Sequence, residues 1–177
     1  MKKLIIIALA LAFGAMPVWG EEAKKTFSFR GVEFGMGIDE VEAIETGEMQ
    51  GEINDGVMSY EIKEEIYDFK SFALDYKFEF NKLNAISLFI FVPPTMKDYK
   101  TQYAEIKADL WAEYGGDDKD LVNDDIWFSC LSNVLFNQSF KVDAVFANYY
   151  SLEPDEDEYS YAIIIDFTLQ PPNEKAQ

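Results

Sequence analysis

Hydrophobic and polar residues alternate with period two along several stretches, which predicts β-strands with one buried face. The clearest stretch carries Phe72, Leu74, Tyr76, Phe78 and Phe80. A second carries Ile86, Leu88, Ile90 and Val92, and Asn81-Lys82 is predicted to turn the chain between the two. Further strands are predicted at residues 58–62, 126–130, 142–146 and 159–167. The short connection requires the first two strands to pair antiparallel.

The second stretch is apolar on both sides. Phe89 and Phe91 alternate with its other apolar residues, so they belong to the opposite face of the same strand. A strand that is apolar on both faces belongs near the centre of a sheet or at an interface. Phe89 and Phe91 are therefore candidates for a binding surface.

Two segments show helical spacing instead. A long helix is predicted from the spacing of Tyr99, Tyr103, Ile106 and Leu110, and Gly115-Gly116 ends it. Residues 38–45 predict a short helix with Ile38, Val41 and Ile44 close to one face. The segment 117–125 between the long helix and the next strand is acidic, and we expect a loop there.

This order of elements predicts the α+β class. We expect a single antiparallel β-sheet of about six to eight strands, with one short and one long helix packed mainly on one face. Residues 21–177 would form a single α+β domain with frayed polar termini, because no repeat or linker divides them.

Residues 1–20 resemble a secretory signal peptide. Lys2 and Lys3 precede an apolar run from Leu4 to Ala15, which is too short to span a membrane. No cysteine follows the run, so no lipoprotein anchor is expected. The mature protein is predicted to be periplasmic or secreted, without a stable membrane anchor after cleavage.

Charge and composition exclude several classes of function. The formal net charge is -18 and Arg30 is the only arginine, so the chain lacks the basic surface that nucleic-acid binding needs. Histidine is absent, which excludes Ser-His-Asp triads and histidine-ligated metal sites. Cys130 is the only cysteine and lies in an apolar run, so it is expected to be buried and unreactive.

An acidic turn near the end of the chain is a candidate metal site. Asp155, Asp157 and Glu158 supply the clustered oxygen ligands that Ca2+ prefers, but the EF-hand spacing is missing. A solvated hairpin turn explains the same residues. No other cofactor is expected.

Aromatic residues offer a second kind of site. Trp111 follows the core-facing Leu110 and belongs at the margin of the helix face, while Tyr149 and Tyr150 follow a predicted strand. Exposed rings at these positions, with Phe89 and Phe91, would bind a protein or a sugar. Core packing is the alternative for each of them.

The opening Phe34-Gly35-Met36-Gly37-Ile38-Asp39-Glu40-Val41 resembles a motif shared by small, uncharacterised exported bacterial proteins. Their form is aromatic-Gly-Met-x-x-x-Glu-Val, and Gly37 stands where they prefer Ser or Thr. Leu110–Gly116 is similar to their Leu-x-x-x-Tyr-Gly helix end. A looser similarity extends to SmpA/OmlA-type and β-lactamase-inhibitor-protein-like envelope domains. The resemblance implies an interaction module and supplies no catalytic residues.

The leading hypothesis is an exported, non-enzymatic module that binds a protein or another envelope component. A carbohydrate- or small-ligand-binding domain is the first alternative. A hydrolase using paired carboxylates is the second, because the chain holds 33 acidic residues.

Overall fold

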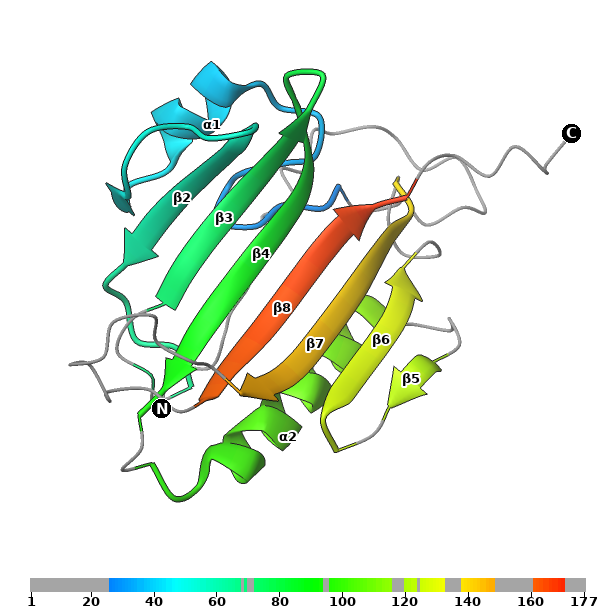
Figure 1. The fold of residues 1–177 in the computed structure, drawn as a ribbon. Helices are drawn as coiled ribbons and strands as arrows, with labels where there is room; N and C mark the ends of the chain where they lie inside the picture. Colours follow the sequence, from blue (N-terminus) through cyan, green and yellow to red (C-terminus); the bar gives the residue numbers. More distant parts are fainter. Residues whose placement is uncertain are drawn as a thin grey trace, which may run out of the picture.

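The computed structural model describes residues 26–67, 69, 72–93, 96–115, 120–123, 125–132, 138–148 and 161–170. Over these residues the chain forms one eight-stranded antiparallel sheet with a short and a long helix (Figure 1). This confirms the expected α+β class. The predicted signal peptide, the Tyr149-Tyr150 pair and the acidic turn with Asp155, Asp157 and Glu158 lie outside the described residues.

The strand order across the sheet is β1-β2-β3-β4-β8-β7-β6-β5. The helical segments are α1 (Ile38–Ile44), α2 (Tyr99–Leu110) and the π-helical turn η1 (Trp111–Gly115) that continues α2. The strands are β1 (Glu48–Met49), β2 (Val57–Ile62), β3 (Phe72–Glu79), β4 (Lys82–Val92), β5 (Asp120–Asn123), β6 (Trp127–Ser132), β7 (Phe140–Asn148) and β8 (Tyr161–Leu169). The two-sided apolar strand, β4, pairs with β3 and β8 in the middle of the sheet, as its composition predicts.

Helix α2 covers one face of the β6–β8 half of the sheet, behind the strands in the view of Figure 1. Its Tyr103 hydroxyl donates a hydrogen bond of 2.8 Å to the carbonyl of Ala144 on β7. Tyr99 stacks on Phe146 with ring centroids 5.2 Å apart, and Tyr114 of η1 meets Phe167 edge-on at 5.3 Å. These contacts define the core face of the sheet.

The segment before α1 extends the same core. Phe27 stacks on Phe34 with centroids 4.6 Å apart, and it also contacts Phe140 of β7 at 4.6 Å. Val41 is the fully buried residue of α1. Gly37, at the helix N-terminus, has no side chain to cap it, and its N–H donates to the Glu40 carboxylate at 2.7 Å.

The β3–β4 connection differs from the expected one. A bulge between Lys77 and Phe78 shifts the register, β3 ends at Glu79, and Phe80-Asn81 form the turn, one residue earlier than predicted. Phe80 is 93% exposed, so its expected place on the buried face is wrong. The alternation that runs to Phe80 conceals the turn, because the turn residue is itself hydrophobic.

The acidic segment after η1 also differs from expectation. Residues 120–123 form β5, an edge strand paired with β6, where a loop was predicted. Backbone pairing does not depend on polar side chains, and charged residues are common on edge strands because they discourage aggregation.

Candidate binding surface on the open face of the sheet

Side chains of β2–β4 and β6–β8 that alternate with core residues point to the side of the sheet away from α2. We call this side the open face, because none of the described helices lies on it. The pairing registers align its residues into rows that run across the strands.

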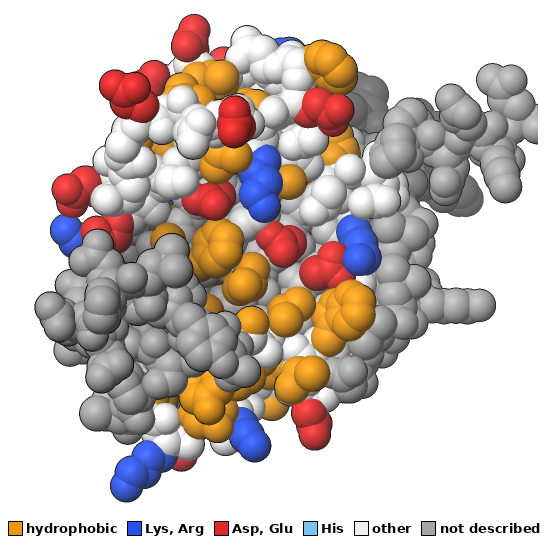
Figure 2. All heavy atoms as spheres, viewed as in Figure 1, with side chains coloured by type: hydrophobic (Ala, Val, Ile, Leu, Met, Phe, Trp, Pro, Cys, Tyr) orange, Lys and Arg blue, Asp and Glu red, His pale blue; other side chains and the backbone are white. Residues whose placement is uncertain are grey.

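One of these rows is apolar. The apolar row contains, in register from β3 to β6, Ala73, Phe89, Ile164, Val145 and Trp127. A shorter row beside it contains Phe91, Ala162 and Ala147. Phe89 and Phe91 are half-buried, and Trp127 is 42% exposed. Figure 2 shows hydrophobic side chains spread over the lower part of this face, with acidic and basic groups above them.

The next row on the open face is polar. The aspartate row contains Ser59, Asp75, Ser87, Asp166, Asp143 and Ser129. The Ser59 hydroxyl donates to Asp75 at 2.7 Å, and the fully buried Ser87 hydroxyl donates to Asp166. Three carboxylates therefore cross the centre of the face beside the apolar row.

Charge on this row is only partly balanced. Asp143 and Asp166 lie directly opposite each other on β7 and β8, an arrangement in which like charges repel. Lys141 forms an ion pair of 2.9 Å with Asp143. The indole N–H of Trp127 approaches the same carboxylate at 3.4 Å. Ser129, at the end of the row, is 1% exposed, and its hydroxyl has no hydrogen-bond partner in the part of the chain that the structure describes.

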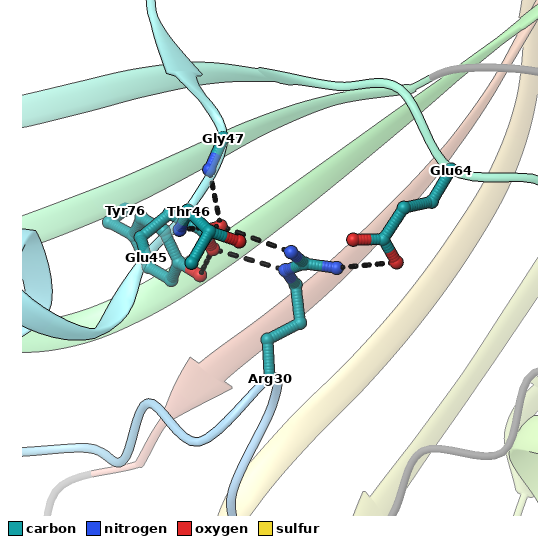
Figure 3. A network of polar contacts seen from close by, with 6 residues as sticks. All are labelled: Arg30, Glu45, Thr46, Gly47, Glu64 and Tyr76. Atoms are coloured by element: carbon teal, nitrogen blue, oxygen red, sulfur yellow. Dashed lines mark hydrogen bonds and ion pairs between the residues drawn. The ribbon is translucent and has the colours of Figure 1, made fainter.

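A second polar cluster, the Glu45 cluster, joins the end of α1 to the Arg30 turn and to β3 (Figure 3). The Glu45 side chain is 0% exposed and accepts hydrogen bonds from the Arg30 guanidinium at 3.1 and 3.2 Å and from the Tyr76 hydroxyl at 2.7 Å. The backbone N–H groups of Thr46 and Gly47 donate to it as well, at 2.8 and 3.0 Å. Arg30 also pairs with Glu64 at 3.0 Å.

The Glu45 cluster is structural in character. Burial alone would raise the pKa of Glu45, but the hydrogen bonds from Arg30 and Tyr76 and the charge of Arg30 outweigh it and hold the pKa below its usual value. A carboxyl with a lowered pKa and satisfied oxygens is unsuited to general acid catalysis. The cluster instead fastens the Arg30 turn and the end of α1 to β3.

The structure places the described candidates for a binding surface on different faces of the sheet. Phe89 and Phe91 lie on the open face, whereas Trp111 contacts Phe128 edge-on at 6.5 Å on the core face. Cys130 is buried, as expected. Within the described ranges no group of three Asp, Glu, Cys or His side chains is placed to hold a metal ion.

Two residues of the candidate surface, Val145 and Asp143, were not singled out from sequence. Period-two alternation assigns each to the face opposite the core. Only the register of β7 with β8 and of β6 with β7 aligns them with Phe89 and Asp166.

No family model, no curated protein and no solved structure matches the chain. The resemblance to small exported proteins therefore depends on its motif residues alone. In the described part of the chain, no helix is both long and apolar enough to cross a membrane.

Proposed function

We propose that this protein is an exported, non-enzymatic binding module that holds a segment of a partner protein on the open face of its sheet. The observation that carries the proposal is the alignment of the apolar row with the aspartate row. Phe89, Ile164 and Val145 lie in register on three adjacent strands. Burial of such a surface by a partner would supply the hydrophobic part of the affinity.

Charge selects the chemistry of the partner. Asp75, Asp143 and Asp166 cross the open face, and the whole chain carries a net charge of -18. A partner segment with lysine or arginine beside apolar side chains complements both rows. The two rows are two residues apart along each strand, about 7 Å, which is also the spacing of alternate side chains in an extended peptide. We expect apolar and basic residues two positions apart in that segment.

A charge introduced into the apolar row tests the proposal. Val145→Glu places a carboxylate in the middle of the row, and Ala108→Glu places the same group on the exposed surface of α2. We expect Val145→Glu to weaken binding of the partner isolated from cell extract by more than tenfold and Ala108→Glu to leave it unchanged. The wild-type affinity should fall as salt is raised. Equal binding by both folded variants would refute the proposal.

A sugar-binding function is the second candidate, because Trp127 presents an exposed indole next to the Asp143 carboxylate. Aromatic faces and carboxylates together are suited to sugar rings. Titration with glycans would change the fluorescence of Trp127 under this alternative and leave it constant under the protein-binding proposal. The carboxylate-dependent hydrolase would show turnover above background in a glycosidase panel, and loss of turnover in Asp166→Asn.

A further inference from the structure

The turn between β3 and β4 carries an aromatic side chain where the backbone disfavours one. Phe80 and Asn81 have φ of 50° and 59°, the left-handed region that both central residues of a type I′ turn require. Asparagine tolerates this region, whereas a bulky residue there is strained. Phe80 is also 93% exposed, so packing against the core does not offset the strain.

Another turn of the same chain has residues that favour positive φ at both central positions. Asp55-Gly56 turn the chain before β2 with φ of 49° and 76°, and Asn54 and Val57 exchange backbone hydrogen bonds of 3.2 and 2.9 Å around them. Aspartate and glycine are residues that this backbone favours. The contrast shows that this turn conformation does not require phenylalanine at position 80. Backbone strain of this kind is concentrated at functional positions.

We propose that Phe80 is an anchor that inserts into an apolar pocket on a partner protein, and that lysine or arginine side chains rim this pocket. Aromatic residues, phenylalanine among them, are enriched at the cores of protein–protein interfaces. Figure 1 shows the β3–β4 turn projecting at the end of the sheet where α1 lies. The proposal does not depend on the open face, because Phe80 lies beyond the last paired residues, Glu79 and Lys82.

The surroundings of the turn determine which partner fits. Gly37, which precedes α1, lies beside the turn, since a Cβ on it would be 3.8 Å from the Asn81 carbonyl oxygen. The exposed carboxylates of Asp39 and Glu40 follow it directly. Glu79 precedes the turn and the exposed Lys82 follows it, so three carboxylates and one ammonium group flank the turn and the local charge is negative. An anionic membrane or a second copy of this acidic chain would be repelled here, whereas a basic rim would be attracted.

Photo-crosslinking with competition tests the proposal. The full chain with Phe80→p-benzoylphenylalanine is irradiated in extract of the source cells, and the same replacement at Glu105, exposed on α2, serves as the control position. Unlabelled wild type, Phe80→Asn or Asn81→Gly is then added as a competitor for the partner, and the yield of the crosslinked adduct is measured. Asn81→Gly is a matched control, because it relaxes the same turn and keeps the aromatic ring.

We expect an adduct from position 80 and none from position 105. Wild type and Asn81→Gly should suppress it equally, and Phe80→Asn should need at least about 30-fold more protein. Circular dichroism verifies that all three competitors are folded. Equal competition by Phe80→Asn overturns the proposal, and so does an adduct with a second copy of the chain. Binding of wild type, but not Phe80→Asn, to phosphatidylcholine vesicles with no protein adduct would also overturn it.

Discussion

Asp143 of β7 lies directly opposite Asp166 of β8 in the middle of the open face. Lys141 neutralises the first carboxylate, whereas the Ser87 hydroxyl donates a hydrogen bond to the second without neutralising its charge. Like charges in this position cost stability. Their presence fits a surface that presents negative charge to a partner.

Replacement of one carboxylate separates stability from binding. Asp166→Asn removes the repulsion and keeps an oxygen for Ser87, so the free energy of unfolding should rise by about 0.2–1 kcal/mol. Asp75→Asn is the control, because the residues directly opposite Asp75 are Ser59 and Ser87, and neither is acidic. Urea denaturation measures the free energy of unfolding of both variants. A clear loss of stability in Asp166→Asn would show that the carboxylate is needed for folding.

The buried Glu45 should be the most costly acidic residue to neutralise. The Arg30 side chain is 19% exposed and forms ion pairs with Glu45 and Glu64. Glu45→Gln removes the first ion pair and leaves the second. We expect a loss of about 2–4 kcal/mol in the free energy of unfolding. The exposed ion pair of Lys63 and Glu48, at 3.0 Å, is the comparison, and Lys63→Gln should cause no measurable loss. Similar effects of the two substitutions would contradict the structural role of Glu45.

The lowered pKa of Glu45 makes its contribution depend on pH. The carboxylate is favoured in the folded state, so its stabilisation is fully present above the ordinary pKa of 4.5 and is lost as pH falls through the lower folded value. The difference in unfolding free energy between wild type and Glu45→Gln should therefore be constant near pH 7 and shrink in acid. A difference that stays constant down to pH 3 would be inconsistent with this pKa shift.

Relief of the strained turn should stabilise the fold. Phe80→Asn puts a residue that tolerates positive φ in the first turn position, and we expect a gain of about 1 kcal/mol. Asn81→Gly should give a gain of smaller size, since glycine also increases the entropy of the unfolded chain. Thermal unfolding followed by circular dichroism measures the shift. Destabilisation by Phe80→Asn would mean that the ring contributes to folding after all.

Much of the fold follows from local pattern. Alternation predicts β3, β4 and β8, and the two-sided composition of β4 predicts its central place, because those signals depend on near neighbours in sequence. The turn at Phe80 could not be predicted in this way, since hydrophobicity marks burial and not backbone conformation. The edge strand β5 escaped detection because its pairing with β6 involves backbone groups.

The candidate site was less accessible to sequence reasoning. Phe89 and Phe91 follow from the alternation within one strand. Their alignment with Ile164, Val145 and Trp127 requires the non-local pairing of β4 with β8, of β8 with β7 and of β7 with β6. Trp111 was expected at the margin of the helix face from its position beside Leu110, and its half-buried ring packs against Phe128.

Solvent access to Trp127 tests the central claim most directly. A variant with Trp19→Phe and Trp111→Phe keeps Trp127, exposed on the open face, as its only tryptophan. Acrylamide quenching of its fluorescence is measured with and without the isolated partner protein. The open-face proposal predicts that bound partner shields the indole and reduces quenching. Unchanged quenching at saturating partner would contradict it and place the binding site elsewhere on the molecule.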